Sequence, residues 1–169
     1  MKRIISIVVT ACALTLGQAA MAETVAGVGF ARLSDGDIGL SAIEATIGWK
    51  METASGFAII PELRLGTGVG DDQIATGAAL ADVELSSALG FNLRTEWSFE
   101  NTYVFLQPSY VNYEVEVSAL GFTAAADDWE FGVGAGIGYK MTDWTSIEIS
   151  YEDIGGTSLI GASIRFEFN

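Results

Sequence analysis

Charged side chains recur at every second position in several segments, and these are the residues that could do chemistry. Glu148 and Glu152 share one parity in such a segment, and Glu62 and Arg64 share one in another. Successive side chains of a strand point to opposite faces, so each pair lies on one face. Carboxylates grouped with basic residues could act as general acids and bases, pass protons or ions, or neutralise one another as ion pairs.

The residue inventory argues against catalysis. The sequence contains no histidine, which removes the Ser-His-Asp mechanism. Its single cysteine, Cys12, lies in a predicted export signal, so a mature chain would have neither a thiol nor an ordinary zinc ligand set. Each inward carboxylate has a structural explanation as an ion-pair partner. We therefore predict no enzymatic activity, no cofactor and no metal site.

The element that must position these charges is best seen in residues 129–141, WEFGVGAGIGYKM. One parity carries Trp129, Ile137 and Tyr139, whereas the other carries glycines with Glu130 and Lys140. An apolar face with an aromatic residue near each end, opposite a small or charged face, is typical of a strand that crosses an outer membrane. The other apolar segments alternate in the same way, with turn residues between them.

The whole pattern predicts an all-β fold, an eight-stranded antiparallel up-and-down transmembrane β-barrel. We expect a bulge at Pro61, outward Val83 and Leu85, a short loop over residues 116–128 and a turn at 95–101. Residues 69–81 are predicted to be a loop or a continuation of the strands beyond the membrane. The inward glycines of 129–141 should make room for Tyr103 and Phe105. The predicted strands are Thr24–Leu33, Leu40–Met51, Phe57–Gly68, Asp82–Arg94, Thr102–Val115, Trp129–Met141, Ser146–Asp153 and Ser158–Phe168.

The inward positions hold a mixed-charge set. An eight-stranded barrel is just wide enough for its side chains to fill it, so these charges are predicted to pair and plug the interior. The alternative is a proton or ion path through a narrow, porin-like channel. The charges selected for this network are Glu44, Glu62, Arg64, Glu84, Arg94, Glu130, Lys140, Glu148 and Arg165, and Lys50, Glu152 and Glu167 share the same inward parity.

The first residues resemble a targeting signal rather than part of the fold. A basic start, a short apolar run and small residues at Ala20 and Ala22 predict a signal peptide over residues 1–22 and a barrel domain over residues 23–169. Residues 9–12, VTAC, also fit a lipoprotein box, which would place a lipid on Cys12. Cleavage after Ala22 is the better match, because a full apolar region precedes it.

The net charge of the chain limits the kinds of partner that it is expected to bind. Removing Lys2 and Arg3 leaves six basic residues against 22 acidic ones, a net charge of −16. Such a chain is not expected to bind nucleic acid, whose phosphates attract Lys and Arg. Acidic pairs at residues 35–37, 71–72 and 127–128 lie in predicted outer loops. They are expected to be solvated, or to contact lipopolysaccharide phosphates weakly through divalent cations.

Residues 134–139 (GAGIGY), Thr142-Asp143, the 148–151 alternation and the terminal segment 163–168 (SIRFEF) resemble the small outer-membrane β-barrel family, which includes opacity-type, OmpX-like and OmpA transmembrane-domain proteins. The resemblance covers residues 23–169. It implies a monomeric integral protein of a Gram-negative outer membrane, with an envelope or adhesion role and contacts to lipid and lipopolysaccharide. It also implies that Phe166 and Phe168 form the C-terminal signal for the barrel-assembly machinery, although Asn169 departs from the usual aromatic end.

A third possibility is a soluble lipocalin-type barrel that holds a small ligand. It would require the apolar face to point inward and the charged face to point outward. The aromatic residues near the strand ends would then have no purpose. Dependence on detergent separates these alternatives.

Overall fold

The computed structural model describes residues 22–36, 38–53, 56–76, 79–119 and 122–168. Residues 1–21, which include most of the predicted signal peptide and Cys12, lie outside the described residues, as do Asp37 and Asn169. In the described part, no helix is long and apolar enough to cross a bilayer. The strands are β1 Glu23–Asp35, β2 Ile38–Glu52, β3 Phe57–Gly68, β4 Asp71–Thr76, β5 Ala79–Phe99, β6 Thr102–Ala119, β7 Phe122–Thr142, β8 Thr145–Ile154 and β9 Thr157–Phe168.

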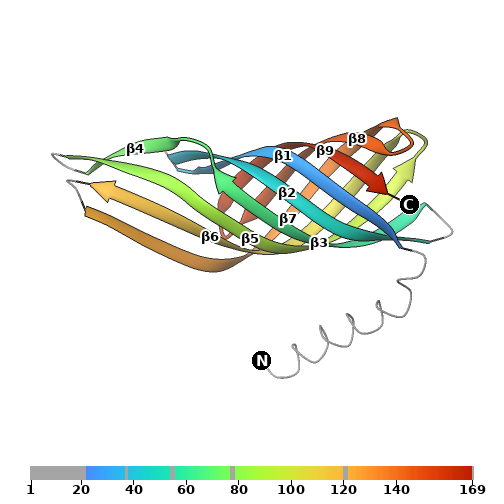
Figure 1. Ribbon diagram of the computed structural model, residues 1–169, viewed down its shortest axis with the longest axis horizontal. Helices are drawn as coiled ribbons and strands as arrows, with labels where there is room; N and C mark the ends of the chain where they lie inside the picture. Colours follow the sequence, from blue (N-terminus) through green and yellow to red (C-terminus); the bar gives the residue numbers. More distant parts are fainter. Residues whose placement is uncertain (1–21, 37, 54–55, 77–78, 120–121, 169) are drawn as a thin grey trace, which may run out of the picture.

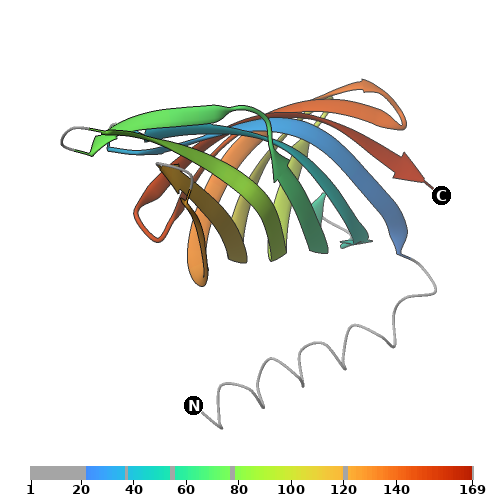
Figure 2. The same ribbon diagram turned by 60° about the vertical axis from the view of Figure 1, so that its left-hand side comes forward.

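The strands form one closed antiparallel ring. Their order is β3-β2-β1-β9-β8-β7-β6-β5, and β3 pairs with β5 to close it. β4 follows β3 after a break at Val69 and Gly70 and pairs with the upper part of β5, so it prolongs a hairpin rather than adding a ninth position. The strands wrap around a common interior (Figure 2). The predicted eight-stranded up-and-down barrel is confirmed.

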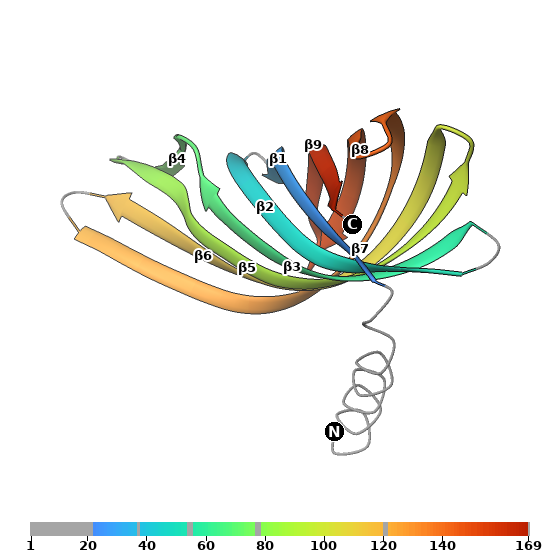
Figure 3. The same ribbon diagram turned by 45° about the vertical axis from the view of Figure 1, so that its right-hand side comes forward.

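The two ends of the barrel differ in the length of their connections. At the end where β1 begins and β9 finishes the turns are short, as at Glu100 and Asn101, whereas β4 to β7 run far past the ring at the opposite end (Figures 1 and 3). Short turns face the periplasm in bacterial barrels, and longer connections face outside. The extended end is therefore the outer end.

The side-chain alternation of β7 follows the prediction. Phe131 and Val133 are more than half exposed, whereas Gly132, Gly134 and Gly138 are buried against the interior. Ile149 on β8 and Ile160 on β9 continue the exposed apolar surface around the ring, and we call this surface the apolar belt. In water so large an exposed apolar surface would be unfavourable, but hydrocarbon is its natural solvent.

Two predicted boundaries were wrong, because strands run further than predicted. Residues 116–128 are not a loop, since β6 and β7 remain paired up to Ala119 and Phe122. In the outer hairpins a strand needs no lipid-facing alternation, so it lacks the signal on which the prediction relied. The turn predicted at 95–101 shrinks to Glu100 and Asn101 at the opposite end of the barrel. Residues 69–81 contain β4 and the start of β5, as expected if the strands continue beyond the membrane.

One face assignment on β5 was also wrong. The pairing of β5 with β6 shifts register between Leu85 and Ser87, which marks a β-bulge. An extra residue reverses the parity of everything above it. Val83 and Leu85 consequently point inward and are buried, and Glu84 is exposed rather than part of the interior.

The bulge predicted at Pro61 is absent. The register between β2 and β3 is the same on both sides of the proline, from Gly48 with Glu62 to Met51 with Ile59. The cross-strand pairs between these two are missing from the ladder instead, because proline has no N–H to donate.

Candidate functional site: the charged barrel interior

The periplasmic third of the interior is organised around Lys50. Its ammonium group lies 2.9 Å from Glu52 Oε1, 3.1 Å from Glu167 Oε1 and 3.9 Å from Glu96 Oε1. Lys50 and Glu96 are each only 1% exposed. Sequence reasoning assigned Glu96 to a turn and missed it; the continuing alternation from Arg94 to Glu96 was the available signal.

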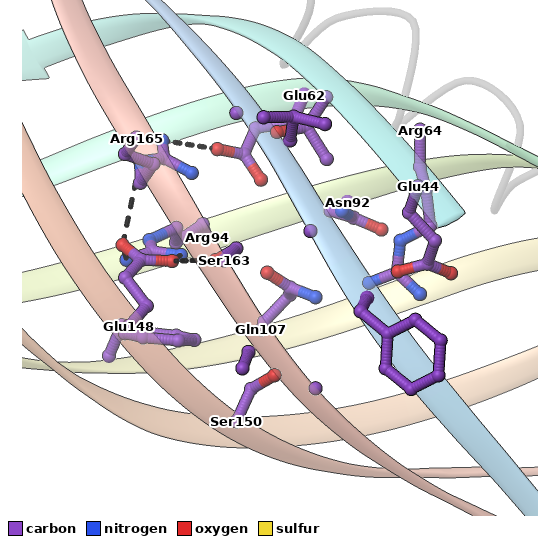
Figure 4. A pocket seen from close by; sticks show the side chains of 18 residues that line it. Glu44, Glu62, Arg64, Asn92, Arg94, Gln107, Glu148, Ser150, Ser163 and Arg165 are labelled. Atoms are coloured by element: carbon purple, nitrogen blue, oxygen red, sulfur yellow. Dashed lines mark hydrogen bonds and ion pairs between the residues drawn. The ribbon is translucent and has the colours of Figure 1, made fainter. Parts of the chain in front are cut away.

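The middle of the interior is organised around Glu148. Its carboxylate accepts hydrogen bonds from Arg94 (Nη1 to Oε2, 3.1 Å), the Tyr103 hydroxyl (2.6 Å) and Ser163 Oγ (3.3 Å). Arg165 places Nε 3.6 Å from Glu148 Oε1 and donates through Nη2 to Glu62 (Figure 4). Charges from β3, β5, β8 and β9 thus converge at one level.

Two aromatic rings pack against the guanidinium group of Arg94. Its guanidinium carbon lies 3.4 Å from the centroid of Phe105 and 5.8 Å from that of Tyr103, a cation–π geometry. A Cβ atom at Gly136 would clash with the Phe105 ring, and one at Gly138 with the Tyr103 ring. The alternating glycines of β7 therefore give these rings their space.

A second level, nearer the outer end, joins Arg64 and Glu152. Arg64 Nη2 donates to Glu152 Oε2 over 2.8 Å, and Ser109 donates to the other oxygen of the same carboxylate. The Glu44 side chain lies beside Arg64 (Figure 4). We call the paired set the lumen network: Lys50, Glu62, Arg64, Arg94, Glu96, Glu148, Glu152, Arg165 and Glu167.

The interior keeps a small polar cavity of about 60 Å³ between the two levels. In the described part, Asn92, Glu44 and Arg64 have buried polar atoms around it that make no hydrogen bond to protein. Space of this size holds on the order of four waters, which would satisfy such groups. The cavity is too small for an organic substrate.

An apolar layer closes the outer end of the charged zone. It is a cluster of nine buried residues that includes Leu33, Leu40, Leu85 and Ile154. A smaller apolar cluster of Val25, Ala58 and Ile60 lies towards the periplasm, at the same level as the charges around Lys50, because Ala58 pairs with Glu96 across the strands. Sequence reasoning missed the outer layer, because the inverted parity of β5 hid Val83 and Leu85.

The predicted inward charges are brought together only in part. Glu62, Arg64, Arg94, Glu148 and Arg165 pair within the interior. Glu44 also points into the interior, where it lies beside Arg64 and lines the small cavity. The remaining three lie elsewhere: Glu84 is exposed outside, Glu130 is half-buried near the outer mouth, and Lys140 is half-buried beside the periplasmic turn after β7.

The predicted C-terminal signal lies on the outward side of β9. The Phe166 ring stacks on Trp144 at a centroid distance of 5.9 Å, and Phe168 is 51% exposed. In the described part, no three acidic side chains come close enough to hold a metal ion. Chemically, the interior can neutralise charge and retain a few waters.

No protein-family model and no curated protein sequence matches this chain. Among solved structures, Ail, the attachment invasion locus protein of Yersinia pestis, aligns with a TM-score of 0.59 at 10% identity, over 87% of this chain and 96% of that one. The N-terminal β-barrel domain of Pseudomonas aeruginosa OprF aligns with a TM-score of 0.58 at 10% identity, over 88% and 100%. Neisserial surface protein A gives 0.54 at 11%, over 87% and 97%. This chain therefore has the fold of the small outer-membrane β-barrels.

Proposed function

We propose that this protein is an integral outer-membrane barrel with a structural role in the envelope, and that its interior does not conduct ions. The observation that carries the proposal is the lumen network, a buried set of paired charges that an apolar layer closes at its outer end. A conducting pore needs a continuous hydrated path, and paired charges capped by apolar residues do not provide one.

The membrane location is tested by fractionation combined with gel mobility. The barrel should be recovered with outer membranes and should migrate differently before and after boiling in detergent, because a folded barrel resists detergent until it is heated. Recovery in a surfactant-free periplasmic extract would instead favour the soluble lipocalin-type alternative.

The closed interior is tested by planar-bilayer recording. The refolded protein should give no steps above those of protein-free bilayers. Steady single-channel steps that disappear in Glu148→Leu would support the narrow-channel alternative.

Lipid and lipopolysaccharide are the expected partners. The exposed apolar belt supports contact with lipid chains, and Phe166 and Phe168 are proposed as the signal for the barrel-assembly machinery. The ring leaves no unpaired strand edge within the belt, which supports a monomer. Contact between the acidic outer hairpins and lipopolysaccharide phosphates would need divalent cations. Calorimetric titration with calcium tests it, and no heat at millimolar calcium would contradict it.

An adhesion role would have to use an acidic surface. One solved Ail structure is a complex with the heparin analogue sucrose octasulfate, a polyanion. The outer hairpins here carry Glu84, Glu114 and Glu116 instead, so any adhesion partner is proposed to be neutral or cationic.

A further inference from the structure

The outer mouth of the barrel contains a second cavity, distinct from the charged interior. Its volume is about 470 Å³, within the range of small-molecule sites. It lies between the β1–β2 hairpin and the extended strands β5 to β7, above the apolar layer that closes the interior.

One side of this cavity is apolar. Its wall consists of Leu33, Leu40, Val83, Leu85 and Val115, with the Tyr113 ring beside them. These residues belong to or pack against the buried outer cluster, so the apolar wall is already formed without a ligand. The β5 bulge creates it by turning Val83 and Leu85 inward.

The opposite side carries carboxylates. Asp128 and Glu130 lie on β7, and Asp35 lies at the end of β1. In the described part of the chain, none of the three forms an ion pair. This distinguishes them from the carboxylates of the lumen network, each of which has a cationic partner.

The protein offers almost no positive charge here. Among the described residues, Lys50, Arg64, Arg94 and Arg165 are buried in the interior, and Lys140 lies near the periplasmic turn. Arg32 remains near the outer end, where it is exposed on the side that faces away from the cavity. Among the described residues, no cation of the protein would therefore compete with a cationic ligand for these carboxylates.

We propose that the mouth cavity binds a cationic amphiphile, a small molecule with one positively charged head and one apolar body. The body would pack on Leu85 and Val115, and the head would meet Asp128 and Glu130. This inference goes beyond the envelope role and does not depend on whether the interior conducts.

The test uses the full mature barrel in nanodiscs of zwitterionic phosphatidylcholine, with ¹³C-labelled Leu and Val methyl groups. Decyltrimethylammonium, decyl sulfate and decyl maltoside are titrated below their micellar concentrations, and empty nanodiscs correct for partitioning. The methyls of Val83, Leu85 and Val115 should shift saturably with the cation, at least about tenfold more tightly than with either other probe. Equal affinity for the three probes, or shifts that never saturate, would overturn the proposal.

Matched variants separate charge from shape. Asp128→Asn with Glu130→Gln should weaken cation binding about tenfold, whereas Glu114→Gln with Glu116→Gln, on the outer face of the same hairpin, should change it less than about twofold. Ala126→Phe fills the cavity and should abolish binding, whereas its neighbour Ala125→Phe should not. Each variant must keep the heat-dependent gel shift. Folded Ala126→Phe that binds like the parent would contradict the site.

Discussion

The apolar belt and the outer hairpins are built from the same strands but place their side chains in opposite ways. On the lower part of β6, Val104 and Leu106 face outward and Gln107 faces the interior. On its upper part, Val115 faces inward, and Glu116 lies on the outer face with its partner Glu84. In β5 the bulge exchanges the two faces of the strand. In β6 the faces stay the same, and the apolar residues change from the outward to the inward positions of the sequence.

The reversal shows where the solvent changes. Within the membrane, lipid surrounds the barrel, so apolar residues are stable outside and charges must be paired inside. Above the membrane water surrounds the hairpins, and the ordinary preference returns, with apolar residues inside and acidic residues outside. The position of the β5 bulge, next to Ser86, marks the level at which one environment replaces the other.

The largest loss of stability should come from a substitution in the charged interior of the barrel, at the level of the apolar belt. Glu148→Gln leaves Arg94 and Arg165 without their shared carboxylate charge, so it should reduce the free energy of unfolding by about 3–5 kcal/mol. Urea unfolding in phosphatidylcholine vesicles measures it. A loss below about 1 kcal/mol would mean that the lumen network contributes little to stability.

A charge on the belt's outer surface should cost somewhat less. Ile149 lies in the middle of β8 and is 63% exposed, so Ile149→Arg should destabilise the barrel by about 2–4 kcal/mol. Ser118→Arg, near the tip of the β6–β7 hairpin, should be nearly neutral because water surrounds it. If both variants lost the same free energy of unfolding in the same assay, the belt and the hairpin would not differ in their surroundings.

The glycine face of β7 provides a smaller test. Gly138→Ala pushes a methyl group into the Tyr103 ring, and such overpacking costs about 1–3 kcal/mol. Gly161→Ala is the matched control, since its nearest neighbour is the movable Ser150 hydroxyl. Similar unfolding midpoints for the two variants would show that the ring at Gly138 has room to move.

The belt was predictable from the sequence because lipid imposes a strict two-residue period on it. That period predicts the number of strands and the closure of the barrel. It also predicts which charges point inward: Glu62, Arg64, Arg94, Glu148 and Arg165. The outer hairpins were not predictable in the same way. One bulge residue exchanges the faces of Val83 and Glu84, and nothing in local composition marks it. Which inward carboxylate meets which arginine depends on strand stagger, and that emerges only from the closed ring.

The smallest effect should come from the same substitution made outside the membrane. Glu116→Gln removes one carboxylate charge, as Glu148→Gln does, but from the water-facing side of the β6–β7 hairpin. In the described part of the chain Glu116 has no cationic partner, so its loss should change the free energy of unfolding by no more than about 0.5 kcal/mol. Relief of repulsion from Glu84, its cross-strand neighbour, would make the change slightly stabilising. A cost comparable to that of Glu148→Gln would mean that the hairpin is stabilised by charge, and the distinction between the two regions would then fail.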